Sequence, residues 1–155
     1  MKILNFLNEE FIIDNLKSNS KSDVLLELSS HLVSTFKLKE DAADIVKILE
    51  AREELGSTGI GDGIAIPHGK ISSIDDELLV VGRSMEGVDF NSMDGNPVYL
   101  FFLLVGPENS VGMHLKALAR LSRLLNDEAT RESLIKADNR SSIYSLLVEA
   151  DSKFN

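Results

Sequence analysis

The chain has 155 residues, 43% of them hydrophobic, so it is long enough for one domain with a core of ordinary size, and we expect residues 1–155 to form a single domain. It contains no cysteine, which excludes disulfides, thiolate metal sites and cysteine nucleophiles. Its formal net charge of −9 repels polyanions, so nucleic acid is not an expected partner and a basic protein partner is favoured.

The first residues carry one lysine and an early acidic pair, Glu9 and Glu10, which is not the pattern of a secretory signal. The longest apolar run, at residues 98–105, is far shorter than the roughly 20 residues that a membrane-spanning helix needs. We therefore expect a cytoplasmic protein that does not insert directly into a membrane.

Two amphipathic helices are predicted first, at residues 20–36 and 41–54, from apolar side chains that repeat every three or four positions. Gly56 follows the second helix as a candidate left-handed cap. Buried strands are predicted at 78–82 and 98–105, because both runs are short, apolar and bounded by turn residues.

Helical periodicity returns after Gly106, with one leucine-rich segment at 115–125 and shorter helices near 128–137 and 141–149. Strands buried on both faces imply helices on both sides of the sheet. The pattern predicts an α/β protein, a three-layer α/β/α sandwich, with no linker or repeat that divides it.

Four glycines, Gly56, Gly59, Gly61 and Gly63, fall within eight residues of the segment GSTGIGDGIAIPHGK at 56–70. Glycines let backbone N–H groups converge on an anion, so the segment is interpreted either as a cradle for phosphate or carboxylate or as an irregular turn. The spacing fits neither the P-loop nor the dinucleotide-binding glycine motif, so a nucleotide is not implied.

A short strand is predicted at 64–66, and His68 lies at the end of this strand. The ring of Pro67 fixes the backbone directly before the histidine. At neutral pH an unperturbed imidazole is mostly neutral, and its free nitrogen can attack phosphorus. The resulting phosphoramidate passes its group onward readily, which suits a carrier better than a hydrolase. The alternative is a histidine with a purely structural role.

The segment AREELGSTGIGDGIAIPHGK at 51–70, with LLVGPE at 103–108 and HLKALAR at 114–120, resembles the IIA domain of the bacterial phosphoenolpyruvate-dependent phosphotransferase system, fructose and mannitol class. Within it the chain is most similar to the nitrogen-regulatory branch. The resemblance implies a phosphotransferase component with a mixed sheet and no cofactor or metal. It also implies that His68 receives a phosphoryl group from a histidine phosphocarrier protein and passes it to a IIB domain.

The resemblance also implies site roles for Arg52 and His114, which match the arginine before the glycine loop and the second histidine of the family. A guanidinium has a permanent positive charge and several N–H donors, which can stabilise the oxygens of a transferring phosphoryl group. His114 is expected at a helix start, where it would hydrogen-bond a phosphate on His68. Ser57 and Thr58 are further phosphate-binding candidates, together with the loop glycines, and turn stabilisation is their alternative role.

The other ionisable residues are not expected to bind the phosphoryl group. His31 is expected to be an ordinary helical histidine, and Asp62 would raise the pKa of His68 if it lay nearby. His68, His114 and Asp62 lack the tight spacing of a zinc motif. The acidic cluster of the second helix, Glu50, Glu53 and Glu54, is interpreted as a solvated face.

Two functions stay open. One is a phosphoryl carrier that serves sugar transport through a IIB domain. The other is a regulatory module whose phosphorylation at His68 alters its contacts with transporters or sensor proteins. A metal-dependent hydrolase is a distant third possibility.

Overall fold

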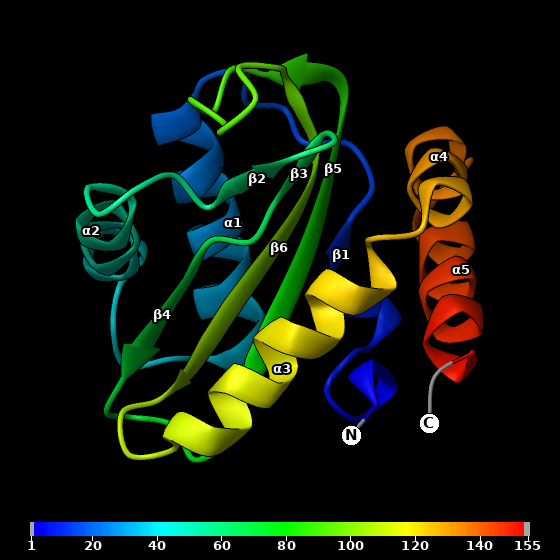
Figure 1. The fold of residues 1–155 in the computed structure, drawn as a ribbon. Coiled ribbons are helices and arrows are strands. Elements are labelled where there is room, and N and C mark those ends of the chain that lie inside the picture. Colours follow the sequence, from blue (N-terminus) through cyan, green and yellow to red (C-terminus); the bar gives the residue numbers. More distant parts are fainter. Residues whose placement is uncertain (1, 154–155) are drawn as a thin grey trace.

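The computed structural model describes residues 2–153, in which six strands form one mixed sheet with helices on both faces (Figure 1). The strand order is β1-β5-β6-β3-β2, and β4 also pairs with β6. This arrangement confirms the predicted α/β/α sandwich. The strands are β1 (Ile12–Ile13), β2 (Gly59–Gly61), β3 (Ile64–Ala65), β4 (His68–Ile71), β5 (Leu78–Val88) and β6 (Val98–Pro107).

All five predicted helices are present, with limits close to those expected. They are α1 (Lys21–Phe36), α2 (Ala42–Glu53), α3 (Val111–Leu124), α4 (Glu128–Lys136) and α5 (Arg140–Ser152), preceded by the short 3-10 helices η1 (Ile3–Asn5) and η2 (Glu9–Phe11). Ser20 caps α1 by accepting a hydrogen bond from the Asp23 N–H, and Asp41 forms a capping box with Asp44 at α2. Gly56 has a positive φ of 133°, but it lies beyond the Glu54 cap and is not the left-handed cap that we expected.

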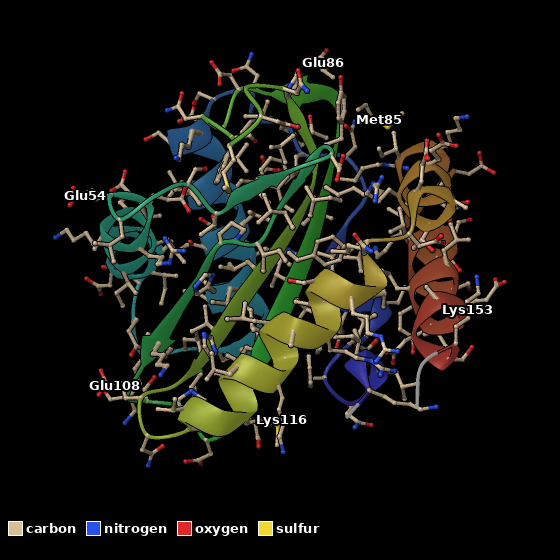
Figure 2. All side chains as sticks on the ribbon, in the orientation of Figure 1. Glu54, Met85, Glu86, Glu108, Lys116 and Lys153 are labelled. Carbon is tan, nitrogen blue, oxygen red and sulfur yellow. The ribbon has the colours of Figure 1, made fainter. Side chains whose placement is uncertain are left out.

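Two separate apolar cores lie on the two faces of the sheet. Helices α1 and α2 cover one face, and η1, α3, α4 and α5 cover the other (Figure 1), with their buried side chains in the two cores. Because successive residues of a strand point to opposite faces, the fully apolar β6 contributes to both cores. The labelled charged residues Glu54, Lys116 and Lys153 are exposed on the outer surfaces of the helical layers (Figure 2).

The chain around His68 differs from the prediction. In place of one strand that ends in the histidine, two short parallel strands, β3 and β4, pair one after the other with β6, and His68 begins the second. Pro67 has no N–H to donate, which interrupts the ladder, but its carbonyl accepts the Leu104 N–H at 2.9 Å. His68 is therefore anchored in the sheet at a break between strands.

The two long strands exceed their predicted limits. β5 continues from residue 82 to Val88, and β6 continues from residue 105 to Pro107. β5 and β6 pair antiparallel, with Leu78 opposite Val105. Among the described residues, no helix combines the length and apolar character needed to cross a membrane.

Candidate active site

The imidazole of His68 has a hydrogen-bond partner at each ring nitrogen. Nδ1 lies 2.8 Å from the Ile66 carbonyl oxygen, and Nε2 lies 3.3 Å from Nε of Arg52. An arginine N–H only donates, so Nε2 must accept, and Nδ1 must carry the ring proton that it donates to the carbonyl. The ring is therefore a neutral Nδ1–H tautomer whose lone pair is on Nε2.

Electrostatics favour the same neutral state. Partial burial lowers the pKa of His68 below its ordinary value of 6.5, and the positive charge of Arg52 lowers it further. The hydrogen bond to the Ile66 carbonyl acts in the opposite direction. At neutral pH the Nε2 lone pair is thus available as a nucleophile.

Arg52 comes from the last turn of α2 and joins the histidine to the glycine loop. Its Nε–H faces His68, and its Nη1 donates to the Gly56 carbonyl at 2.7 Å. The second contact fixes the guanidinium plane beside the nucleophile. Such a group supplies a permanent charge and several donors to a phosphate.

His114 lies near His68, on the other side from Arg52's helix. The two ring centroids are 5.9 Å apart, although 46 positions separate the residues in sequence. His114 is on the first turns of α3, and its side chain is buried. Its Nδ1 contacts Oε1 of Glu77 at 2.6 Å. The structure therefore brings Arg52, His68 and His114 into one site.

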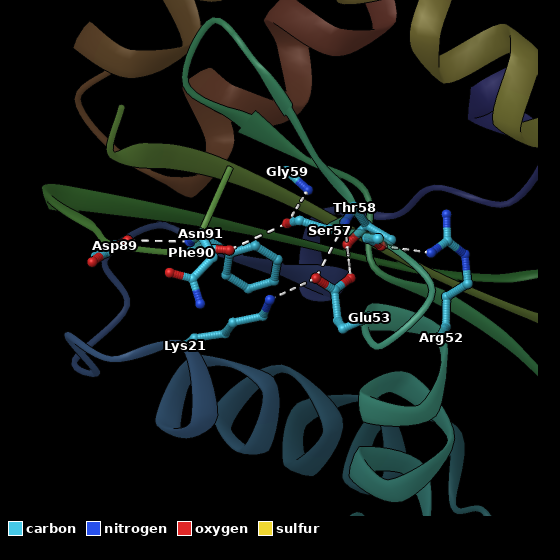
Figure 3. Close-up of polar contacts among 10 residues, drawn as sticks. Lys21, Arg52, Glu53, Ser57, Thr58, Gly59, Asp89, Phe90 and Asn91 are labelled. Atoms are coloured by element: carbon cyan, nitrogen blue, oxygen red, sulfur yellow. Dashed lines mark hydrogen bonds and ion pairs between the residues drawn. The ribbon is translucent and has the colours of Figure 1, made fainter. Parts of the chain in front are cut away.

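A chain of hydrogen bonds connects α2 to the Nδ1 side of His68. The Glu53 carboxylate accepts the backbone N–H and the hydroxyl of Thr58, and it pairs with Lys21 at 2.8 Å (Figure 3). The Thr58 carbonyl accepts the Ile66 N–H at 3.0 Å, and the Ile66 carbonyl in turn accepts the His68 ring proton. The glycine loop thus helps to orient the imidazole.

The interpretation of the acidic cluster of α2 is wrong for Glu53. Its side chain is only 6% exposed, because it turns inward under the loop. Glu50 and Glu54 are exposed, and Figure 2 shows Glu54 at the rim of α2. The helical spacing of apolar residues does not by itself show which of two adjacent glutamates will contact the loop that follows the helix.

The other predicted phosphate ligands lie in the same loop and have internal partners. Ser57 donates its hydroxyl to the Phe90 carbonyl and accepts the Gly59 N–H (Figure 3). Gly59 and Gly61 belong to β2, and the turn from β2 to β3 needs positive φ at Gly61 and Gly63, 97° and 78°. The phosphate-binding roles of Ser57, Thr58 and these glycines stay predictions.

The remaining candidates lie elsewhere. His31 is on α1, where Nε2 contacts the Glu10 carbonyl at 2.9 Å. Asp62 is exposed in the turn between β2 and β3, where its N–H binds Asp94, and its charge is not among the causes of the lowered pKa of His68. Within residues 2–153, the structure gathers no group of three or more potential metal ligands.

Three polar contacts of the site were missed from the sequence: the Glu77 carboxylate, the Glu53 carboxylate and the Ile66 carbonyl. Glu77 and His114 are 37 residues apart, and no local spacing rule joins them. Gly106, the glycine beside Glu77, lies just after the strand predicted at 98–105, and only the structure places it inside β6, where a glycine often marks a close approach by another group.

Comparison with known proteins identifies the family of the chain. The family model of the phosphoenolpyruvate-dependent sugar phosphotransferase system, EIIA 2, matches residues 5–150. A nitrogen regulatory protein of Bradyrhizobium diazoefficiens is 40% identical over 147 residues, 95% of each chain. A fructose-specific EIIABC component of Bacillus subtilis is 39% identical over 97% of this chain, which spans only 24% of that relative's length.

Solved structures share the fold. The nitrogen regulatory protein IIA-Ntr of Neisseria meningitidis matches with a TM-score of 0.85 at 33% identity, over 92% of this chain and 97% of that one. The mannitol enzyme IIA of Escherichia coli, solved in complex with phosphorylated enzyme IIB, matches with a TM-score of 0.77 at 23% identity, over 92% and 97%. The chain belongs to the EIIA 2 family of the phosphoenolpyruvate-dependent sugar phosphotransferase system.

Proposed function

We propose that this chain is a phosphoryl carrier that accepts a phosphoryl group on Nε2 of His68 from a histidine phosphocarrier protein. One observation carries the proposal: Nε2 holds a lone pair and lies 3.3 Å from a guanidinium N–H of Arg52. Nucleophile and anion-binding group therefore meet at one point, as phosphoryl transfer requires. The cytoplasmic location expected from the sequence is part of this proposal.

The transfer exchanges one nitrogen–phosphorus bond for another. The bond from phosphorus to the donor imidazole breaks, and the donor nitrogen keeps the electron pair. The His68 lone pair forms the new bond. Arg52 stabilises the oxygens of the transferring group, and His114 donates a hydrogen bond to them. The glycine loop, with Ser57 and Thr58, shapes the pocket.

The downstream step has two candidates. Transfer to a IIB domain draws support from the complex of mannitol enzyme IIA with phosphorylated enzyme IIB and from the fructose-specific relative. A regulatory role draws support from the nitrogen regulatory protein, which is 40% identical. The accepting step at His68 is the same in both.

The accepting step is tested with phosphoenolpyruvate and the general phosphotransferase proteins. We expect wild type to acquire an acid-labile, alkali-stable phosphate, and His68→Ala to acquire none. Ring-nitrogen NMR of the labelled protein should place phosphorus on Nε2. Equal labelling of wild type and His68→Ala would refute the assignment.

The downstream step is tested by adding a purified IIB domain to the phosphorylated protein. Rapid loss of phosphate to the IIB domain supports the transport role. A stable phosphoprotein whose binding to a transporter or sensor domain depends on the phosphate supports regulation.

A further inference from the structure

A carboxylate lies behind His114, on the side of the ring that faces the sheet. Glu77 precedes β5, its side chain is 2% exposed, and Oε1 lies 2.6 Å from Nδ1 of His114. The His114 side chain is itself 5% exposed. A contact this short between two buried groups is a strong, charge-assisted hydrogen bond.

The backbone is built to admit this carboxylate. The pairing of Leu78 with Val105 puts Glu77 beside Gly106 of β6. Any Cβ at Gly106 would overlap Oε2 of Glu77, so the carboxylate occupies the place of the missing side chain. Oε2 is buried and has no hydrogen-bond partner among the described residues. The carboxylate therefore depends on His114 for its stabilisation.

This contact fixes the proton of the second histidine. A carboxylate oxygen only accepts, so Nδ1 of His114 carries the proton and donates it. Nε2 is then the nitrogen available to the phosphoryl group. It donates to an oxygen of that group only if it too is protonated, and a carboxylate at Nδ1 stabilises the doubly protonated ring that results.

We propose that Glu77 is a positioning residue that holds His114 as the Nδ1–H tautomer and lets Nε2 take up a solvent proton when His68 is phosphorylated. This inference rests on the proposed function. Phosphorylation brings a dianionic group to the site, while the His68 ring keeps its Nδ1 proton and gains one positive charge. The site therefore gains one net negative charge, which the proton taken up by His114 offsets. Glu77 stabilises the resulting cation from behind.

Other charged groups surround the pair. His68 on β4 and Arg52 on α2 lie on the phosphoryl side. Glu77 also lines a cavity of about 1080 Å³, whose other charged lining residues are Asp76, Lys116, Arg120 and Arg123. Asp76 is exposed, so it serves as a matched control for the loss of one negative charge near the site.

The test uses the full chain labelled with 15N-histidine and reads the His114 ring nitrogens by NMR. In the free protein we expect a proton on Nδ1 and none fixed on Nε2. Phosphoramidate, a small donor that needs no partner protein, then phosphorylates His68. In that state we expect both nitrogens of His114 to be protonated at pH 7.

Glu77→Gln keeps the size of the side chain and removes its charge. We expect its phosphorylated form to leave His114 singly protonated at pH 7 and to transfer its phosphate about tenfold more slowly or worse. Asp76→Asn should match wild type in both measurements. Backbone amide spectra verify the folds.

Two results would overturn the role of Glu77: a wild-type proton on Nε2 of His114 instead of Nδ1, or the same His114 protonation in phosphorylated wild type and Glu77→Gln. The first is read on the free protein and stands even if Glu77→Gln does not fold. Failure of the proposed function looks different, since His68 would then remain unlabelled while the tautomer of His114 is unchanged.

Discussion

In the proposed phosphoryl transfer, the guanidinium of Arg52 has two successive tasks at His68. In the free protein its Nε–H donates a hydrogen bond to the lone pair of Nε2. Once that lone pair forms a bond to phosphorus, the same N–H loses its acceptor, and phosphoryl oxygens take its place. The hydrogen bond from Nη1 to the Gly56 carbonyl holds the group nearby throughout. Under this proposal Arg52 first orients the imidazole of His68 and then stabilises the phosphorylated product.

The protonation of His68 provides the first prediction. Burial and then the charge of Arg52 lower its pKa below 6.5. Removing that charge in Arg52→Gln favours the protonated ring, so we expect the pKa of His68 to rise in this variant. The measurement is an NMR titration of the His68 ring, compared with Lys47→Gln, which removes an exposed charge from the same helix.

The same shift affects stability, and its sign follows from proton binding. The unfolded chain binds the His68 proton first as the pH falls through 6.5, because the pKa of the folded protein is lower. The free energy of unfolding therefore decreases from pH 6.5 down to the folded pKa. His68→Gln should weaken this decrease.

For the Arg52→Gln titration, an unchanged or lowered pKa of His68 would show that the charge of Arg52 does not act on the ring.

At the scale of elements, the end of α2 organises the site through two adjacent residues. Arg52 contacts His68. Glu53 points under the glycine loop to Thr58 and Lys21 (Figure 3). The ammonium of Lys21, at the start of α1, also lies 4.6 Å from the centre of the Phe90 ring. One helix end thus joins α1, the loop and the nucleophile.

Loss of the Glu53 carboxylate should loosen this junction. In Glu53→Ala the Thr58 N–H and hydroxyl lose their acceptor, and leaving such buried groups unpaired costs about 1–3 kcal/mol. We expect urea unfolding to show a loss of this size and the amides of Thr58 and Ile66 to exchange faster with solvent. The exposed Glu54→Ala is the control and should stay within about 0.5 kcal/mol of wild type. Equal stability of the two variants would contradict the role of Glu53.

The regular elements were predictable because their signals are local. The helices at Lys21–Phe36 and Ala42–Glu53 have an apolar period and a cap within a few residues of each other. The strands β5 and β6 are long enough to show an apolar run. Strands that are buried on both faces, combined with amphipathic helices before and after them in the chain, imply the three layers.

The strands β1 and β2 and the partners of the two histidines were not predictable by such signals, although a strand at 64–66, the position of β3, was predicted. Strand β1 has two residues and β2 has three, too few to show any period. The contact of Glu77 with His114 depends on the register of β5 against β6, which is a property of the assembled sheet. Arg52 and His114 were found through the family resemblance, since neither has a distinctive local pattern.

At the scale of the whole molecule, apolar side chains are exposed along the segments that bear the site. Leu55, three positions after Arg52, is 84% exposed, and Leu115, next to His114, is 60% exposed. Exposed apolar side chains beside a functional site are typical of a protein contact surface. The net charge of −9 favours a basic partner for that surface.

Leu55→Asp and Leu115→Asp should therefore slow phosphorylation by the phosphocarrier protein and leave labelling by phosphoramidate unchanged, because the small donor needs no contact surface. A loss of about 1.4 kcal/mol of binding free energy in each variant would lower the rate at limiting carrier concentration about tenfold. Leu26→Asp is the control for Leu115→Asp, since Leu26 is 46% exposed on α1, which covers the opposite face of the sheet from α3. Equal slowing with both donors would mean that the substitutions damage the site itself, and unchanged rates with both would place the contact surface elsewhere.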